Sequence, residues 1–184
     1  YEMLRSLVGS EMCIRDRYIP KENVLGNPSK GFKQFLRTLT GGRITIGALA
    51  LGTAQGAYER ALKYSCEREA FGKQINKFQA ISFKLADMAT SIEASKHLVY
   101  NAAYLKDKGE DIIKEAAMAK LFSSEMCMRV TTEAIQVLGG YGYIKEYDVE
   151  RFFRDSKILE IGEGTSEVQR IIISREILKN ISSV

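Results

Sequence analysis

The sequence has few prolines, cysteines and histidines. Its 184 residues include two prolines, and both lie before residue 30. Because proline removes a backbone donor and clashes with the preceding helical turn, the rest of the chain can form long unbroken helices. The three cysteines form no CxxC pair, and an odd number argues against a disulfide framework. We therefore expect no metal site and a reducing compartment.

One histidine, His97, limits the chemistry further. A Ser/His/Asp hydrolase would need it, but no nucleophile-elbow pattern accompanies it, so we interpret His97 as an exposed or partly buried helix residue. No apolar run reaches the roughly 18 residues of a membrane span, and none is predicted. The net charge is +4 with both signs interleaved, which predicts no nucleic-acid partner and is compatible with an anionic ligand.

The first seventeen residues, YEMLRSLVGSEMCIRDR, do not fit the rest of the chain. They show no clear hydrophobic period, and their apolar stretch is too short for a secretory signal. They resemble a translated sequencing adapter, so we interpret residues 1–17 as non-native and the chain as a fragment. Residues 18–29 contain Pro20 and the turn-forming Gly26-Asn27-Pro28, and we assign them to the end of a preceding β-rich domain.

Residues 30–184 carry the period of helices. Apolar and small residues recur there at spacings of three and four, and 45% of the whole chain is hydrophobic. The pattern predicts long helices over about residues 30–68, 78–105, 112–138 and 166–181, and a short one over 149–155. Thr165 is a candidate N-cap of the last helix. Because short polar or glycine-containing turns join the long helices, we predict an all-α domain built as an up-and-down four-helix bundle.

Three irregular segments are candidates for chemistry. Arg68 lies beside the Phe71-Gly72 turn, where a guanidinium can clamp a phosphate, although a surface arginine at a helix end is an ordinary alternative. The segment 136–143, QVLGGYGY, lets a ligand approach the backbone, but it also reads as a glycine cap with buried tyrosines. Glu163 stands between two glycines before a helix start, where it is either a mobile acid or a solvated loop charge.

In this order and spacing the three segments resemble the carboxy-terminal helical domain of the acyl-CoA dehydrogenase family. The resemblance runs from Tyr18 to about Lys179. It is supported by further short matches at Pro20–Gly26, Gly41–Ile44, Phe78–Ile81, Lys84–Met88, Lys114–Lys120, Arg154–Asp155, Glu163–Thr165 and Gln169–Arg170.

The resemblance implies an enzyme that removes the α-proton of an acyl-CoA thioester and passes the β-hydrogen to FAD as hydride. The catalytic base would be Glu163, with Arg43 behind it to set its charge and position. In a minority of the family the base comes from the long first helix beside the Gly-Arg motif. Gly42 stands there in this chain, so that alternative carboxylate is absent. Excluding water would raise the pKa of the carboxylate toward that of a useful base.

The resemblance also implies binding residues and partners. FAD would contact Arg68, Phe71, Gln79, Gln136, Val137, Leu138, Gly139, Gly140, Thr165, Ser166 and Glu167, partly in a neighbouring subunit. The acyl-CoA substrate would contact Thr40, Gly41, Gly42, Arg43, Gly140 and Gly164. The protein would be a homotetramer that passes electrons to electron-transfer flavoprotein, in a bacterial cytoplasm or a mitochondrial matrix.

Two departures from the family pattern bear on the substrate. Thr40 replaces a common aspartate, which puts that substrate contact in doubt. Gly162 replaces a tyrosine often found before the base, so acyl chain length is not predicted.

Two other functions stay open at this point. One is a flavoprotein of the same superfamily with altered chemistry, and the other is a non-catalytic helical interaction module. The glycine-flanked Glu163, together with Arg68 and Gln136, argues for the enzyme, because a scaffold would not need them. We expect the isolated fragment to be inactive.

Overall fold

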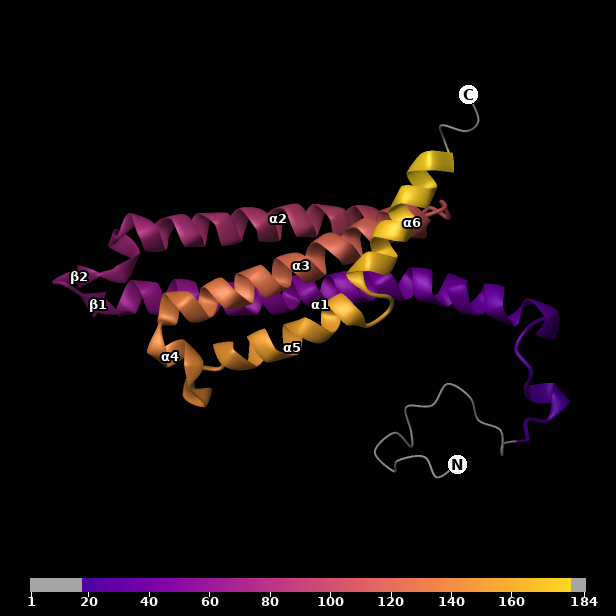
Figure 1. Ribbon diagram of the computed structural model, residues 1–184, viewed down its shortest axis with the longest axis horizontal. Helices are drawn as coiled ribbons and strands as arrows, with labels where there is room; N and C mark the ends of the chain where they lie inside the picture. The colour runs from indigo at the N-terminus through magenta and orange to yellow at the C-terminus, as the bar shows by residue number, and fades with distance from the viewer. Residues whose placement is uncertain (1–17, 180–184) are drawn as a thin grey trace. The chain divides into compact units, whose positions relative to one another are not determined.

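The computed structural model describes residues 18–179, and Figure 1 shows its helices in chain order. The interpretation of residues 1–17 lies outside these residues, as does the predicted helix end at 181. One compact unit ends at Leu36 and a second begins at Arg37. In the first unit, the 3-10 turns Lys21–Asn23 and Pro28–Lys30 precede the first helix. The assignment of residues 18–29 to the end of a β domain stays a prediction.

Helices dominate the described chain, which confirms the all-α prediction. They are α1 (Gly31–Glu67), α2 (Gln79–Asp107), α3 (Ile113–Leu138), α4 (Gly140–Tyr143), α5 (Val149–Ile161) and α6 (Ser166–Lys179). Within the described residues, the limits of α1, α2 and α3 and the start of α6 lie within about two residues of the predicted ones. The predicted short helix is longer than expected, since α5 continues to Ile161. Within residues 18–179, no helix combines the length and the apolar composition of a membrane span.

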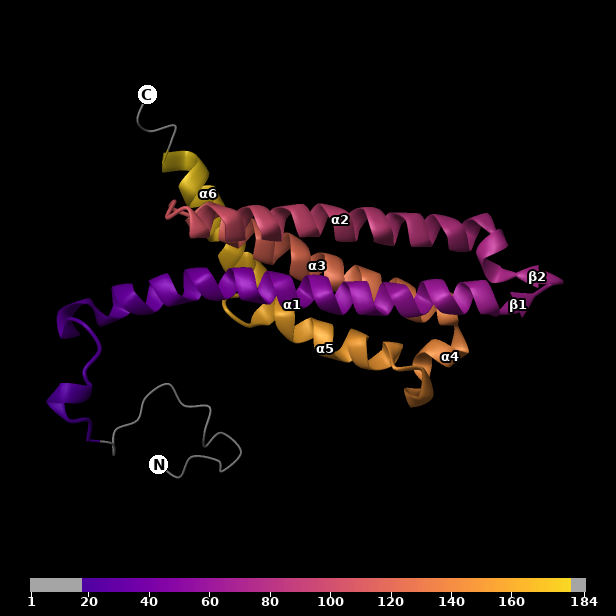
Figure 2. The same cartoon turned by 180° about the vertical axis from the view of Figure 1, so that it is seen from behind.

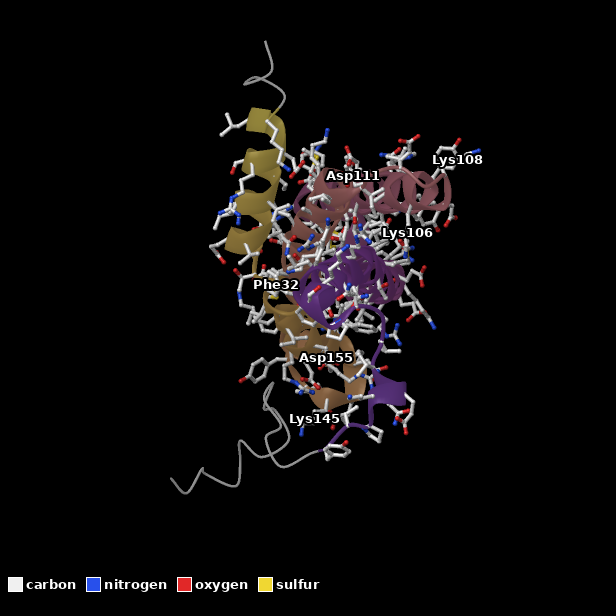
Figure 3. All side chains as sticks on the ribbon, turned by 90° about the vertical axis from the view of Figure 1, so that its right-hand side faces the viewer. Phe32, Lys106, Lys108, Asp111, Lys145 and Asp155 are labelled. Atoms are coloured by element: carbon white, nitrogen blue, oxygen red, sulfur yellow. The ribbon has the colours of Figure 1, made fainter. Side chains whose placement is uncertain are left out.

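Four helices, with α1 counted from Arg37 onward, form the up-and-down bundle of the second unit. Figures 1 and 2 show α1, α2, α3 and α5 lying side by side with alternating direction. The sequence counted the helix that begins at residue 166 among the four of the bundle, but α5 takes the fourth antiparallel position and α6 lies obliquely across the bundle instead. Arg170 of α6 pairs with Glu125 of α3 at 2.6 Å. Figure 3 looks along the bundle and shows Lys106, Lys108 and Asp111 around the predicted polar turn between α2 and α3.

The core between α1, α2 and α3 depends on small residues. Four alanines at helical spacing are fully buried along α1: Ala50, Ala54, Ala57 and Ala61. They share one cluster with larger side chains of α2 and α3 such as Met88, Ile92, Met126 and Val130. Because alanine adds only a methyl group, it lets neighbouring helices approach closely while the larger residues fill the remaining space. Ser95 of α2 and Ser123 of α3 satisfy each other by a buried hydrogen bond of 2.7 Å.

A tight hairpin connects α1 to α2. Strand β1 (Glu69–Ala70) pairs with β2 (Lys73–Gln74) in antiparallel register. Both residues of the turn have positive φ, 52° at Phe71 and 79° at Gly72. Positive φ at both central residues is the geometry of a type I′ turn, which matches the twist of the strands. The sequence indicated only a glycine break here, because a two-residue strand has no periodic signal.

The described cysteines differ in environment, and this gives a chemical test of the core. Cys66 is exposed, whereas Cys127 of α3 is fully buried. Burial raises the pKa of the Cys127 thiol to about 12. Since the thiolate is the reactive form, we expect iodoacetamide at pH 8 to alkylate Cys66 and spare Cys127. Peptide mass spectrometry measures both sites, and a guanidinium-unfolded sample, in which both react, is the control. Equal reactivity in the native protein would contradict this core.

Candidate active site

Glu163 lies in the four-residue connection between α5 and α6. The backbone of this loop turns through two residues with positive φ, 57° at Glu163 and 94° at Gly164. The left-handed region suits glycine, but a residue with a side chain loses stability there. The surrounding structure must therefore hold Glu163 in this conformation.

Two fully buried side chains hold the loop, one from each side. Lys120 of α3 donates hydrogen bonds from Nζ to the carbonyl oxygens of Glu160 at 3.1 Å and Gly164 at 2.8 Å. Gln169 of α6 donates from Nε2 to the carbonyl oxygens of Gly164 at 2.8 Å and Glu163 at 3.3 Å. The carbonyl of Gly164 thus accepts from both residues. Lys120 and Gln169 both fall within the short matches to the family, but the sequence predicted no role for either residue.

The carboxylate of Glu163 rests against α1 at Gly42. A Cβ atom built on Gly42 would lie 2.6 Å from Oε2 of Glu163, closer than two such atoms can approach. That oxygen is buried and has no hydrogen-bond partner among the described residues. A buried carboxylate oxygen without a donor is a costly arrangement in a purely structural site. It leaves a lone pair free to accept a proton from a bound molecule.

Arg43 follows Gly42 and brings positive charge to the same place. Its side chain is 6% exposed, its Nη1 donates to Thr40 Oγ1 at 3.4 Å, and its buried Nε has no partner among the described residues. Burial lowers the pKa of the guanidinium, and the charge of Glu163 opposes this shift. Since arginine stays protonated, the site combines a fixed cation with the carboxylate. The structure therefore brings together Thr40, Gly42, Arg43 and Glu163.

The start of α6 borders this site. Thr165 caps the helix as predicted, because its Oγ1 accepts a hydrogen bond from the backbone N–H of Val168 at 3.3 Å. Ser166 is 7% exposed, and its hydroxyl has no partner among the described residues. The pKa of the exposed Glu167 is lowered by its own backbone N–H and by the side chain of Thr165. A helix N-terminus with an unpaired hydroxyl can accept an anionic group of a cofactor.

A second cluster lies at the far end of α3. A hollow of about 520 Å³ is lined by Tyr64, Arg68, Ile75, Gln136, Val137, Leu138, Gly139, Gly140, Tyr141 and Ile144. The Arg68 guanidinium stands 5.6 Å from the centre of the Tyr141 ring. Gly139 has a φ of 60°, which ends α3 and turns the chain into α4. A cation, a glycine backbone and aromatic rings together suit a nucleotide.

Comparison with known proteins decides the family. The family described as "Acyl-CoA dehydrogenase, C-terminal domain" matches residues 29–178. The chain belongs to the acyl-CoA dehydrogenase family.

Its relatives extend well beyond this chain. Probable acyl-CoA dehydrogenase YngJ of Bacillus subtilis is 56% identical over 92% of this chain and 45% of its own length. The caffeyl-CoA reductase-Etf complex subunit CarC of Acetobacterium woodii is 51% identical with the same coverage. The structure of butyryl-CoA dehydrogenase from Megasphaera elsdenii matches with a TM-score of 0.86 and 52% identity, over 87% of this chain and 42% of that one. The chain therefore spans less than half the length of these relatives.

In this acyl-CoA dehydrogenase domain, the residues expected to bind FAD or substrate lie in several separate regions. Arg68 and Gln136–Gly140 share the hollow, while Gly164–Glu167 lie beside Glu163. Gly41 lies near the end of α2, where a Cβ atom would be 3.2 Å from Lys106 Nζ. Phe71 is 96% exposed at the hairpin tip and Gln79 is exposed at the start of α2, and neither lines the hollow.

Gly140 was expected to contact the substrate together with Gly164. Along α3, Lys120 beside the Glu163 loop and Gln136 beside Gly140 are sixteen residues apart, roughly 24 Å of helix. Within one chain the structure does not bring Gly140 and Gly164 together. A shared contact with one thioester is therefore not formed by a single copy of this domain.

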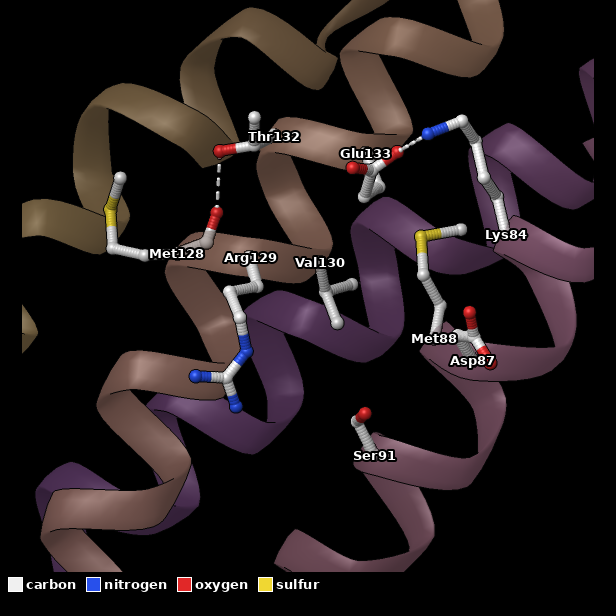
Figure 4. Close-up of a pocket in the computed structure, with 9 residues that line it drawn as sticks. All are labelled: Lys84, Asp87, Met88, Ser91, Met128, Arg129, Val130, Thr132 and Glu133. Carbon is white, nitrogen blue, oxygen red and sulfur yellow. Dashed lines mark hydrogen bonds and ion pairs between the residues drawn. The ribbon is translucent and has the colours of Figure 1, made fainter.

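A groove between α2 and α3 was not predicted from the sequence. It encloses about 410 Å³ and is lined by Lys84, Asp87, Met88, Ser91, Met128, Arg129, Val130, Thr132 and Glu133 (Figure 4). Lys84 and Glu133 form an ion pair across it. None of the residues expected to bind FAD or substrate lines this groove. Its lining comes from two helix faces, and only their packing reveals it.

The contact between Gly42 and Glu163 can be tested by structure. Alanine at position 42 has a higher helix propensity than glycine, but its Cβ atom would lie 2.6 Å from Oε2 of Glu163, so the flexible carboxylate must move away. We expect Gly42→Ala to keep its thermal stability while a crystal structure shows the carboxylate displaced. Gly52→Ala on the same helix is the control, because its Cβ would meet nothing within 4 Å. An undisplaced carboxylate in Gly42→Ala would contradict the geometry described here.

Proposed function

We propose that this chain is the carboxy-terminal domain of an FAD-dependent acyl-CoA dehydrogenase and supplies its catalytic base, Glu163. One observation supports this most directly. The Glu163 carboxylate is aimed at Gly42, with a buried oxygen that has no hydrogen-bond partner among the described residues. Because the chain spans less than half the length of its relatives, the activity belongs to a longer protein.

The chemistry assigned to these residues is proton abstraction. The C–H bond at the α-carbon of an acyl-CoA thioester breaks, and the proton passes to a carboxylate oxygen of Glu163. Bound FAD would supply the acceptor for the hydride that leaves the β-carbon. An α-proton is weakly acidic, so the base must be held close to it and kept from water. The buried Arg43 cation places a fixed positive charge beside the Glu163 carboxylate.

The two clusters on α3 support an oligomeric enzyme. Glu163 and the Arg68 hollow lie at opposite ends of this helix, so we infer that the hollow receives the nucleotide end of a neighbouring subunit's FAD. A homotetramer that shares its cofactors in this way accounts for the exposure of Phe71 and Gln79. Electron-transfer flavoprotein is the proposed electron acceptor, and the name of the Acetobacterium relative includes an Etf complex.

The compartment is also inferred. We place the protein in a bacterial cytoplasm, or in the mitochondrial matrix if the source is eukaryotic. Both described cysteines are free thiols, which suits a reducing environment.

One relative favours a second reaction for the same site. The Acetobacterium protein is named a reductase. Proton transfer is reversible, so in the reverse direction Glu163 would return a proton to the α-carbon of an unsaturated acyl-CoA, and bound reduced FAD would supply the hydride to its β-carbon. The non-catalytic alternative has less support, because a scaffold would not need a buried carboxylate oxygen without a donor.

The base assignment has a direct spectroscopic test. The full-length enzyme is mixed with butyryl-, octanoyl- and palmitoyl-CoA while the visible absorption of its flavin is followed. We expect at least one thioester to bleach the flavin. Glu163→Gln should keep the flavin colour and reduce the bleaching rate by at least about 100-fold, because the amide cannot take the proton.

The matched control is Glu93→Gln, which alters an exposed glutamate on α2 that is paired with Lys96. It should react like the wild type. Undiminished bleaching in Glu163→Gln would refute the assigned base. If the wild type bleaches with none of the thioesters but its reduced flavin is reoxidised by an unsaturated acyl-CoA, the reductase assignment replaces the dehydrogenase.

The hollow at the end of α3 has its own test. Arg68→Met removes the cation beside Tyr141, and we expect the dissociation constant of FAD to rise by about tenfold or more, because a charge-assisted hydrogen bond is lost. Fluorescence titration of the apoenzyme with FAD measures this. Arg60→Met is the control, since Arg60 lies in α1, eight residues before Arg68, and contacts Phe152 and Asp148 instead. Equal FAD affinity in Arg68→Met and wild type would remove Arg68 from the cofactor site.

A further inference from the structure

Lys120 is the largest of the fully buried side chains in the described chain. Lysine is rarely found at 0% exposure, because removing an ammonium group from water is costly unless other groups compensate. Burial lowers the pKa of Lys120, and Glu160 is the first of the charges that oppose the shift. A neutral residue such as leucine would fill a helix core without this cost. The position therefore calls for an explanation beyond packing.

The bonds of Lys120 explain what the ammonium does. It donates to the carbonyl oxygens of Glu160 and Gly164, at 3.1 and 2.8 Å, and these two residues bracket Glu163. Glu160 lies in the last turn of α5, where carbonyl groups have no partner within the helix. The negative end of the α5 dipole adds to the attraction for a cation there. Lys120 thus joins the end of α5 to the residue just after the base.

The two bonds fix the ends of a strained segment. Glu163 has a positive φ, which a residue with a side chain avoids unless its surroundings impose it. Lys120 restrains the chain three residues before Glu163 and one residue after it. The direction of the Glu163 side chain follows from this backbone conformation, and so does the approach of its carboxylate to Gly42. Because Lys120 donates its hydrogen bonds to the backbone of the loop, it restrains the direction in which the Glu163 side chain points.

We propose that Lys120 is a positioning residue that holds the 160–164 segment in the conformation that aims Glu163 at the substrate. Its kinetic consequence rests on the proposed function, but its effect on the loop does not. Gln169 supports the same segment from α6 through the carbonyl oxygens of Glu163 and Gly164. Without Lys120, the loop loses the hydrogen bonds that restrain it at the end of α5, while the hydrogen bonds from Gln169 of α6 remain.

The first experiment measures the loop itself. Lys120→Met in the full-length enzyme keeps the length of the side chain and removes its donors. Hydrogen exchange followed by mass spectrometry compares peptides covering residues 160–166 with peptides from α1 and α2. We expect faster exchange in residues 160–166 and unchanged exchange in α1 and α2. Unchanged exchange in 160–166, or faster exchange throughout the bundle, would overturn the proposal.

The second experiment measures the consequence for catalysis. Misplacing a reacting group by about 1 Å can lower a rate by about 100-fold. We expect Lys120→Met to lower the limiting rate of flavin reduction by about 10- to 100-fold, while the half-saturating acyl-CoA concentration stays within about twofold. Lys120→Gln retains a donor and should recover part of the rate. A lost affinity with an unchanged limiting rate would overturn the proposal.

Two further variants keep the test decisive. Lys114→Met alters the other lysine of α3, which pairs with Glu115 at 3.1 Å, and should behave as wild type in both measurements. Gln169→Leu removes the donor on the α6 side and should also accelerate exchange in residues 160–166, even if Lys120→Met fails to fold. A wild type that reacts with none of the acyl-CoA thioesters would refute the proposed function, while the exchange results would still decide the role of Lys120.

Discussion

Close packing of α1 on its neighbours is the constraint on which the site depends. Four fully buried alanines along α1 let the helix lie close to α2 and α3. Gly47 continues this face, because a Cβ atom added there would lie 3.2 Å from the side chain of Val99. The same approach brings Gly42 and Arg43 up to the Glu163 loop, which α3 holds from its other side. Larger side chains on this face of α1 would push the helix away from α2 and α3. Arg43 would then move away from Glu163, and the space that Gly42 leaves for the carboxylate would change as well, so the site geometry depends on the core packing.

Two positively charged side chains of the site are buried away from water. Arg43 and Lys120 are both buried, and each lowers its desolvation cost by facing acidic groups or carbonyl oxygens. Their surroundings differ, because the Arg43 guanidinium faces the charge of Glu163, whereas Lys120 donates to backbone carbonyl oxygens on either side of Glu163. Neither side chain donates a hydrogen bond to Oε2 of Glu163, which is buried and has no partner among the described residues. Such fixed groups need little rearrangement when a proton moves.

The sequence predicted the parts of this structure that have a local signal. The helical period predicted the long helices. Glu163, Gly42 and Arg43, which the sequence analysis singled out, lie together in the structure. The roles of Lys120 and Gln169 were not predictable, since a lysine in a helix usually lies on the surface and its partners here are 40 and 44 residues away. The extent of α5 and the groove beside Lys84 likewise depend on tertiary packing rather than on periodicity.

Helix α3 sets the spacing and relative rotation of the Glu163 site and the Arg68 hollow. Lys120, beside the Glu163 loop, lies in its first half, and Gln136, which lines the hollow, lies near its end. Adding or deleting one residue between them would rotate one cluster against the other by about 100° and shift it by about 1.5 Å. Substitutions along this helix can be absorbed by neighbouring side chains, but changes of length cannot. Natural insertions and deletions in this domain should therefore fall in the connections after α1 and α2, where the chain can loop out without turning one cluster away from the other.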